Sequence, residues 1–404
     1  MVTISWFVVL LPRKPITSHS LLLRTVGLTL FLFCCPQLLL LPTALADCEC
    51  GYLSTIGNTT DPQQDALFTD LLESDFTHPH TVDLSQDKDW ARQAFNLTSK
   101  RARGDYGEMF AVENVEYQPG GGGAHQDGKR PTTEGLKLLV RDQLVDGMVP
   151  VAEIDTRRLD IFYGTFRASM KVSSVPGTCA AFFWYFNDTQ EIDLEFLTKD
   201  FSPSNSTFPV NLVLQSRQAA EAGYDASQTG TFVQTNLPFN PTDSFHEYRI
   251  DYLASRVLFY ADGALLATMT GPAVPSSPGH LILQHWSNGN KYWSGGPPRE
   301  ESALVVRYVK AYFNSSAEQR QRDWRGRCRD PRAARAVCRI PDVRPGDDSA
   351  AGWFFGSQRN MTNNQTGSEQ DQGEQSEGVT LGRRERWSTV GWLVVVGGCV
   401  VGLL

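Results

Sequence analysis

The sequence lacks an excess of positive charge. Its 37 lysines and arginines are outnumbered by 45 aspartates and glutamates, so the 404-residue chain carries a net charge of −8. A protein that binds nucleic acid needs a basic face for the phosphates. The charge balance therefore argues against a nucleic-acid partner.

Long helical periods are also missing between residues 67 and 313. This region consists of short apolar or alternating runs separated by Gly, Pro, Asn and Asp, a pattern that predicts strands and turns. Asp262-Gly263 offers the positive φ that a tight hairpin turn needs. We therefore expect an all-β fold, an antiparallel β-sandwich of jelly-roll type. The expected strands are 136–140, 163–172, 180–186, 191–197, 210–215, 245–252, 257–260, 265–269, 280–286 and 303–313.

The N-terminal segment 1–46 has the features of a secretory signal peptide. Basic residues precede an apolar run over 26–41, and Ala44-Leu45-Ala46 supplies small residues for cleavage after Ala46. A membrane-spanning anchor is the alternative, which Pro36 and Pro42 oppose. Asn-x-Ser/Thr sequons fit a glycosylated exterior. They occur at Asn58, Asn96, Asn187, Asn205, Asn314, Asn360 and Asn364.

Cysteine is scarce in the exported part of the chain. Outside the signal and the last apolar run, the cysteines are Cys48, Cys50, Cys179, Cys328 and Cys338. We expect Cys328 and Cys338 to bridge a short loop, because they are close in sequence. Cys179 is left to pair with Cys48 or Cys50, and the spacing does not decide between them. A zinc site is the weaker alternative in an oxidising compartment.

The C-terminal part of the chain has little that could build a core. Residues 316–345 are rich in arginine, and residues 346–386 form a polar linker that we expect to be disordered. Residues 387–404 are apolar and uncharged, slightly short for a membrane-spanning helix of about 20 residues. Arginines precede this tail, and a small-residue site such as Ser376 or Gly378 lies upstream. This arrangement favours a glycosylphosphatidylinositol (GPI) anchor signal over a transmembrane helix.

The chain is thus expected to contain six parts. They are a signal peptide (1–46), an N-terminal cysteine-containing extension (47–66), a β-sandwich (67–315), an Arg-rich disulfide extension (316–345), a polar linker (346–386) and a hydrophobic tail (387–404). The tripeptide Arg103-Gly104-Asp105 is treated as a chance match to an adhesion motif.

Three acids alternate with apolar residues in Glu191-Ile192-Asp193-Leu194-Glu195-Phe196. On a strand the carboxylates share one face and the apolar side chains enter the core on the other. Three like charges in one row repel, so stability alone would rarely select them. Glycoside hydrolysis does require paired carboxyl groups, about 5–5.5 Å apart when the reaction retains configuration. The row is therefore a candidate catalytic site, with a solvated charged strand as the alternative.

The segments around this row carry a family resemblance. Gly177-Thr-Cys-Ala-Ala-Phe-Phe-Trp-Tyr185 precedes it, and His280-Leu-Ile-Leu-Gln-His-Trp-Ser-Asn-Gly289 follows with Trp293-Ser-Gly-Gly-Pro-Pro298. Together these motifs resemble glycoside hydrolase family 16, β-glucanases with a concanavalin A-like sandwich, and look closest to secreted fungal members. The resemblance spans about residues 68–313. The acid motif has no extra residue before its last Glu, so it is similar to licheninases and fungal cell-wall transglycosylases rather than laminarinases.

The resemblance implies roles for individual residues. Glu191 would be the nucleophile, Glu195 the general acid/base and Asp193 a helper hydrogen-bonded to the nucleophile. Substrate-binding positions would be Phe183, Tyr185, Asn211, Gln284, Trp286 and Trp293, with Glu153 a less secure match. Flat aromatic faces suit the C–H face of a sugar ring. Gln284 stands where many relatives carry Asn, and Asp155 where licheninases carry Arg, so these departures concern the substrate rather than the mechanism.

The expected function is retaining, endo-acting cleavage of β-1,3(4)-glucan in the cell wall, by a secreted enzyme anchored at the cell surface. A transglycosylase that transfers glucan or chitin chains is the alternative, and a lectin-like binding protein is a lesser one. We expect no cofactor and no catalytic metal, while a structural calcium ion and the oligomeric state are left open. The expected partners are the polysaccharide and, through the tail, the membrane.

Overall fold

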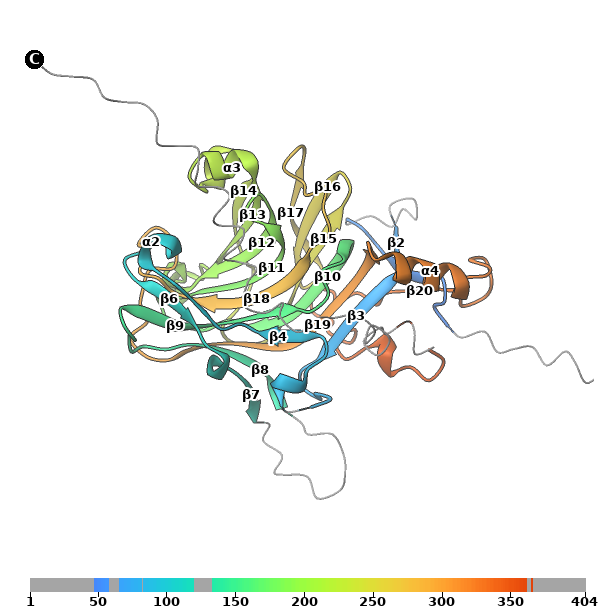
Figure 1. Ribbon diagram of the computed structural model, residues 1–404, viewed down its shortest axis with the longest axis horizontal. Coiled ribbons are helices and arrows are strands. Elements are labelled where there is room, and N and C mark those ends of the chain that lie inside the picture. The colour runs from blue at the N-terminus through green and yellow to red at the C-terminus, as the bar shows by residue number, and fades with distance from the viewer. Residues whose placement is uncertain (1–46, 58–64, 82, 120–132, 362–364, 366–404) are drawn as a thin grey trace, which may run out of the picture. The chain divides into compact units, whose positions relative to one another are not determined.

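The computed structural model describes residues 47–57, 65–81, 83–119, 133–361 and 365 (Figure 1). Two large, mainly antiparallel sheets face each other and enclose one core. The expected all-β sandwich is confirmed. The described helices are short: α2 (Ser99–Ala102), α3 (Arg217–Glu221) and α4 (Glu318–Arg327).

The first sheet has eight strands. Its order is β17 (Ala264–Thr270), β16 (Arg256–Ala261), β15 (His246–Leu253), β10 (Ile161–Lys171), β19 (Ser302–Ser315), β8 (Thr133–Val140) and β7 (Val115–Pro119), with β3 (Asp70–Asp75) also paired to β19. The turn between β16 and β17 has the predicted geometry, with φ of 46° at Asp262 and 75° at Gly263.

The second sheet has nine strands and carries the acid row on β12, the third strand in its order. Its order is β14 (Phe232–Asn236), β13 (Pro209–Ser216), β12 (Gln190–Leu197), β11 (Cys179–Asn187), β18 (His280–Trp286), β9 (Met148–Thr156), β6 (Gly107–Phe110) and β5 (Phe95–Leu97), with β4 (Trp90–Arg92) paired to β9. All pairs between β14 and β9 are antiparallel.

The core lies between the inner faces of the two sheets. Ile192, Leu194 and Phe196 of β12 are fully buried there, as the alternation of this strand predicts. Rings from opposite sheets meet: Phe196 lies 4.8 Å from Tyr248, and Trp184 lies 4.8 Å from Tyr252, centroid to centroid. Burial of each such side chain contributes about 1.5–3 kcal/mol. The inner face of β12 is thus fixed by packing.

A third, three-stranded sheet joins the two ends of the described chain. Its order is β2 (Ala66–Phe68), β1 (Gly51–Ser54) and β20 (Val337–Arg339), and β1 pairs with β20 in parallel. This pairing puts Tyr52 opposite Cys338. The N-terminal and Arg-rich extensions, which the sequence separated, therefore form one unit.

The disulfide prediction is wrong. Cys48 bonds to Cys338 and Cys50 to Cys328, while Cys179 is free and buried. The prediction assumed that closeness along the chain decides the pairing. The parallel contact of β1 with β20 instead brings both N-terminal cysteines against the C-terminal extension.

The first part of the expected polar linker is also ordered, contrary to the prediction. Phe355 is buried, with its ring 5.1 Å from Tyr52 and 5.8 Å from Tyr312. The carboxylate of Glu73 accepts hydrogen bonds from the backbone N–H of Phe355 (3.1 Å) and of Gly356 (2.8 Å). Buried aromatic area and paired backbone groups thus hold residues 346–361 on the outer face of the eight-stranded sheet.

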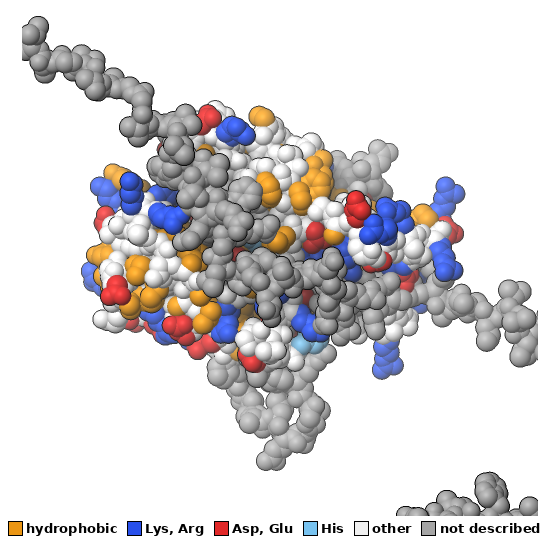
Figure 2. Space-filling view, viewed as in Figure 1, with side chains coloured by type: hydrophobic (Ala, Val, Ile, Leu, Met, Phe, Trp, Pro, Cys, Tyr) orange, Lys and Arg blue, Asp and Glu red, His pale blue; other side chains and the backbone are white. Residues whose placement is uncertain are grey.

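The Arg-rich segment is only partly solvated. Figure 2 shows basic side chains gathered at the end of the molecule where Figure 1 places α4. Arg320 of α4, however, is buried and pairs with Asp70 at 2.7 Å, beside Arg158 at 3.1 Å. Burial alone would raise the pKa of Asp70, but these two guanidinium groups lower it below its usual value. Such a paired buried charge fixes α4 against the sandwich.

Several predicted segments lie outside the described residues. These are the signal peptide (1–46), the rest of the linker apart from Gln365 (362–386), the tail (387–404) and the sequons at Asn58 and Asn364. Within the described residues, no helix has both the length and the apolar character needed to cross a bilayer.

Replacing both Cys50 and Cys328 with serine should lower the free energy of unfolding by about 2–4 kcal/mol, because this second closure beside Cys48–Cys338 further restricts the unfolded chain. Denaturant unfolding of the variant and the wild type measures the difference. A peptide map under non-reducing conditions should show Cys48 linked to Cys338 and Cys50 to Cys328. A peptide that links Cys328 to Cys338 would contradict this pairing.

Candidate active site

The acid row occupies the outer face of the nine-stranded sheet, which we call the acid face. On β12, Asp193 is buried with 5% of its surface exposed, and Glu191 and Glu195 are half-buried. The row is central because β11 and β13 flank β12 on both sides. The structure thus brings the three predicted acids together on the face that the core does not use.

The strand register places a defined row of neighbours beside each acid. Glu195 lies between Asn211 of β13 and Ala181 of β11. Beyond Ala181 the same row continues to Gln284 and then to Glu153. Side chains directly opposite each other in a sheet are close enough to interact. Three predicted polar positions therefore share the row of Glu195.

Hydrogen bonds order these polar neighbours. The Nε2 of Gln234 donates to Oδ1 of Asn211 at 3.0 Å, and Nε2 of Gln284 donates to the carboxylate of Glu153. Asn211 is buried and Gln284 half-buried. Both amides are thus held in place on either side of Glu195.

The middle acid, Asp193, has a strongly perturbed pKa. Burial raises this pKa well above its usual value, and the neighbouring charges of Glu191 and Glu195 raise it further. Asp193 and Glu191 also share a side-chain hydrogen bond. Two carboxyl groups can form such a bond only with a proton between them. Asp193 is therefore the natural holder of a proton that it donates to Glu191.

The environment of Glu195 gives it a pKa of about 7. Burial is the largest cause and raises this pKa, while hydrogen bonds from Cys179 and Trp293 and the charge of Arg103 lower it. The thiol Sγ of Cys179 lies 3.5 Å from Oε1 of Glu195. A carboxyl group with a pKa near neutrality can both give and take a proton in the same cycle.

The predicted aromatic positions fall into two groups. Phe183 is 4% exposed and lies opposite Asp193, so it forms the floor beneath the row rather than an open platform. Tyr185, Trp286 and Trp293 are half-buried on the same face. Tyr185 packs edge-to-face on Phe183 at 6.5 Å and donates a hydrogen bond from its hydroxyl to Asp188 at 2.7 Å. Only the half-buried group offers ring surface to a ligand.

Trp286 and Trp293 lie toward the Glu195 end. Trp286 is opposite Cys179 in the register, and the indole of Trp293 hydrogen-bonds to Glu195. The ring of Trp293 is 6.1 Å from Phe232 of β14. Trp293 thus combines the expected aromatic surface with a direct contact to an acid.

The structure also shows site residues that the sequence did not single out: Cys179, Asp188, Arg103 and Tyr224. Cys179 was within reach of sequence reasoning, because counting back from the turn after Asn187 puts it on the same face as Ala181. Arg103 and Tyr224 come from distant turns, and no local pattern marks them.

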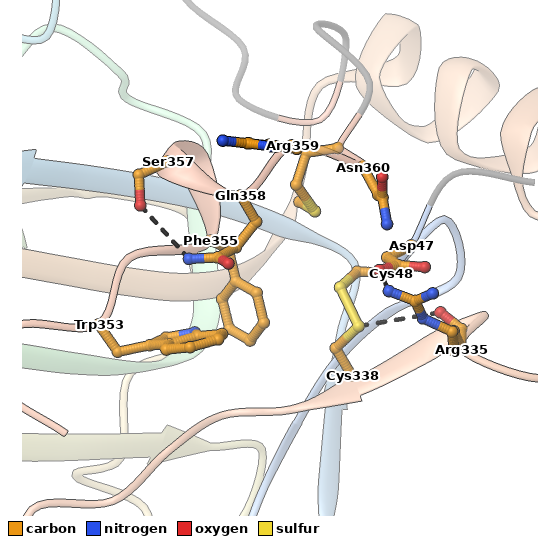
Figure 3. A pocket seen from close by; sticks show the side chains of 11 residues that line it. Asp47, Cys48, Arg335, Cys338, Trp353, Phe355, Ser357, Gln358, Arg359 and Asn360 are labelled. Atoms are coloured by element: carbon orange, nitrogen blue, oxygen red, sulfur yellow. Dashed lines mark hydrogen bonds and ion pairs between the residues drawn. A yellow bond between two sulfur atoms is a disulfide. The ribbon is translucent and has the colours of Figure 1, made fainter.

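A separate pocket of about 460 Å³ lies at the three-stranded sheet, beside the Cys48–Cys338 disulfide (Figure 3). Residues from both chain extensions line it, among them Arg335, Trp353, Phe355 and Asn360. Its lining contains one carboxylate, Asp47, and none of the acids of β12. It therefore offers no carboxyl pair for hydrolysis, and the acid face remains the candidate active site.

The pKa of Glu195 predicts a pH dependence of stability. Since the folded-state value of about 7 exceeds the usual 4.5, the stabilisation is full below pH 4.5 and is lost as the pH rises to about 7. Glu195→Gln, which cannot ionise, should therefore be more stable than the wild type at pH 8 by about 1–3 kcal/mol, and the difference should shrink toward pH 4.5. Denaturant unfolding across this range measures it. Exposed Glu318→Gln is the control, and a difference that stays constant with pH would contradict the prediction.

Residues 132–305 match the family model described as "Glycosyl hydrolases family 16". The Bacillus licheniformis protein named "Beta-glucanase" is 28% identical over 158 residues, which is 37% of this chain and 58% of that protein. The beta-glucanase of Paenibacillus macerans is 31% identical over 139 residues, 33% of this chain and 52% of that protein. "Congo red hypersensitive protein 1" of Saccharomyces cerevisiae is 24% identical over 160 residues, 37% of this chain and 29% of that protein. The match thus spans little more than half of the bacterial relatives, and the special closeness to fungal members stays a prediction.

Solved structures are similar over the sandwich. A lichenase from a mouse hindgut metagenome has a TM-score of 0.44 and 18% identity, covering 60% of this chain and 99% of that one. The Bacillus licheniformis beta-glucanase gives 0.43 and 17%, covering 60% and 98%. The segment that matches the family model contains the acid row of β12 and both Trp286 and Trp293. Residues 132–305 are therefore the part of the chain that is similar to glycosyl hydrolases family 16.

Proposed function

We propose that this protein is an endo-acting, retaining glycoside hydrolase that cleaves β-1,3(4)-glucan. The observation that carries the proposal is the row Glu191, Asp193 and Glu195 on the acid face, with the pKa of Glu195 at about 7. Paired carboxyl groups are the chemical requirement of glycoside hydrolysis. The names of the bacterial relatives, which are beta-glucanases, support a glucan as the substrate.

The first step uses two of the carboxyl groups. Glu195, protonated below about pH 7, donates its proton to the leaving glycosidic oxygen. Glu191 attacks the anomeric carbon as the carbon–oxygen bond breaks, which gives a glycosyl ester on Glu191. Asp193 keeps its proton and donates the shared hydrogen bond to Glu191, which holds the nucleophile in place.

The second step reverses the role of Glu195. Now ionised, it takes a proton from a water molecule, whose oxygen attacks the anomeric carbon and releases Glu191. The products are the sugar with its original configuration and the enzyme with Glu195 protonated again. The hydrogen bonds from Cys179 and Trp293 stabilise the ionised form of Glu195 between the two steps.

Aromatic surface supports a sugar ligand at this face. The half-buried rings of Tyr185, Trp286 and Trp293 would stack on the apolar faces of sugar rings. Asn211 and Gln284, ordered by their own hydrogen bonds, would contact sugar hydroxyls on either side of Glu195. The buried Phe183 supports Tyr185 and does not itself reach a ligand.

Transglycosylation is the second candidate. It differs only in the second step, where a sugar hydroxyl of another glucan or chitin chain takes the place of water. A lectin-like role is less favoured, because pure binding gains nothing from three crowded carboxyl groups. Product analysis on mixed-linkage glucan, laminarin and chitin oligomers separates the three functions. A hydrolase gives only shorter chains, a transglycosylase gives both shorter and longer chains, and a lectin-like protein leaves the chains unchanged.

Export and surface attachment are part of the proposal. The two disulfides support an oxidising, extracellular setting. The N-terminal signal and the C-terminal tail, read from the sequence, support secretion followed by anchoring at the cell surface, in contact with the cell wall.

Glu191→Gln and Glu195→Gln should each lower kcat on β-glucan by about 10³-fold or more, because each removes a group that forms or breaks a bond. Asp193→Asn should lower it by only about 10–100-fold, the equivalent of one charge-assisted hydrogen bond. Release of reducing ends from mixed-linkage glucan measures the rates. Glu318→Gln, on exposed α4, is the matched control and should leave kcat unchanged. Full activity of Glu191→Gln would rule out its role as nucleophile.

Cleavage of a β-linked glucan should release the β-anomer first, because a covalent glycosyl-enzyme inverts the configuration twice. Proton NMR of the products during early turnover, before mutarotation, shows which anomer appears first. An α-anomer appearing first would mean single displacement by water and would exclude Glu191 as a nucleophile. This conclusion does not depend on which β-glucan is the substrate.

A further inference from the structure

Two turns from opposite sides of the nine-stranded sheet touch each other. Arg103 lies between α2 and β6, and Tyr224 lies between α3 and the turn that leads to β14. Figure 1 places α2 beside β6 and α3 beside β14, which are far apart in the strand order. The guanidinium carbon of Arg103 nevertheless lies 4.4 Å from the ring centroid of Tyr224. This cation–π contact, which we call the bridge, spans the strands between them.

The two ends of the bridge are near opposite ends of the acid row. The charge of Arg103 lowers the pKa of Glu195, and the pKa of Tyr224 is raised by burial, by Asp188 and, to a smaller extent, by Glu191. One bridge residue is therefore within electrostatic reach of one end of the row, and the other residue reaches the opposite end. Both side chains are exposed on their outer sides.

The Arg103 end is fixed to the loop that carries Trp293. Nδ2 of Asn288 donates to the carbonyl of Ala102 at 2.6 Å, and Nδ2 of Asn290 donates to the carbonyl of Arg103 at 3.1 Å. The turn at Gly104 packs closely against this loop, because a Cβ on Gly104 would lie 2.2 Å from the carbonyl oxygen of Asn288. The backbone at Arg103 is thus fixed to the loop that also carries Trp293.

The Tyr224 end is fixed to the hairpin between β11 and β12. Its hydroxyl and that of Tyr185 both hydrogen-bond to Asp188, the latter at 2.7 Å. Tyr185 lies directly opposite Glu191 in the register. The bridge therefore continues through Asp188 down to the sheet at the Glu191 end of the row.

Both bridge residues keep a backbone conformation that suits glycine. Their φ angles are 60° at Arg103 and 67° at Tyr224, and Gly223 beside Tyr224 has φ of 75°. Few residues other than glycine, asparagine and aspartate adopt this region, and large side chains there are strained. Retention of such strain at two positions that touch each other points to a function for the contact.

We propose that a glucan chain must lie beneath the bridge to reach the acids, so that Arg103 and Tyr224 select unbranched chains at the point of cleavage. This inference rests on the proposed function and deepens it. In this arrangement a linear chain would pass between the acid row and the bridge. A glucosyl branch on the sugar at Glu191 and Glu195 would need the volume that the Arg103–Tyr224 contact occupies. The guanidinium of Arg103 can also donate hydrogen bonds to hydroxyls of the enclosed sugar.

The test compares kcat/KM on soluble linear β-1,3-glucan oligosaccharides and on the same backbone carrying single β-1,6-linked glucose branches. The wild type should prefer the linear chain by about tenfold or more. Arg103→Ala and Tyr224→Ala should each reduce this preference by at least about threefold, mainly through faster cleavage of the branched chain. The double variant should reduce the preference no further than either single variant, because all three lose the same Arg103–Tyr224 contact. Arg103→Lys, which keeps the charge without the planar group, should fall between wild type and alanine.

Lys100→Ala is the matched control, because it removes a positive charge from the neighbouring exposed helix α2 and should leave the preference unchanged. Alanine at Arg103 or Tyr224 adds no new side-chain strain, and thermal unfolding checks that the variants fold. Equal cleavage of both chains by the wild type, or an unchanged preference in both alanine variants, would overturn the bridge alone. Failure of the wild type to cleave the linear chain would overturn the proposed function and this inference with it.

Discussion

The alternation of side chains along β12 is the constraint on which the rest of the structure depends. A strand turns successive residues to opposite faces, so Ile192, Leu194 and Phe196 can enter the core only if Glu191, Asp193 and Glu195 face outward. A shift of register by one residue would bury three acids and expose three core side chains. Packing of the core therefore fixes the position of the acid row, and the site needs no separate device to orient its strand.

The same row is a source of instability that the sandwich offsets. Burial raises the pKa of both Asp193 and Glu195, which means that their ionised forms are unfavourable in the folded protein. Donors from Cys179 and Trp293 reduce this penalty at Glu195 without removing it. A carboxyl group stabilised fully by a salt bridge would be a poor acid near neutral pH. The cost of ionising Glu195 is only partly offset, which is consistent with a group that must exchange a proton.

Local patterns predicted the parts of the structure that local geometry determines. All ten expected strands form, with ends shifted by a few residues, and the Asp262-Gly263 turn adopts its expected backbone. Seven further strands between residues 67 and 313 were missed: β3, β4, β5, β6, β7, β9 and β14. Six of them are only three to six residues long, and β9 is interrupted by Pro150. The disulfides, the order of residues 346–361 and the meeting of Arg103 with Tyr224 all depend on contacts between segments far apart in sequence. No periodicity carries that information, and so Arg103 was set aside as part of a chance tripeptide.

The two outer faces of the sandwich differ: one is covered by the chain extensions, and the other carries the acid row. On the eight-stranded sheet, Tyr312 and Glu73 are covered by Phe355 and by the backbone of residues 355–356, held there by the unit that the two disulfides close. On the nine-stranded sheet, the acid row keeps half-buried carboxyl groups and rings, and the turns that carry Arg103 and Tyr224 are exposed. A sheet packed on both faces can only stabilise, whereas one with a free face can also bind. The chain extensions therefore do more than lengthen the protein: by covering one outer face, they leave the other as the place for chemistry.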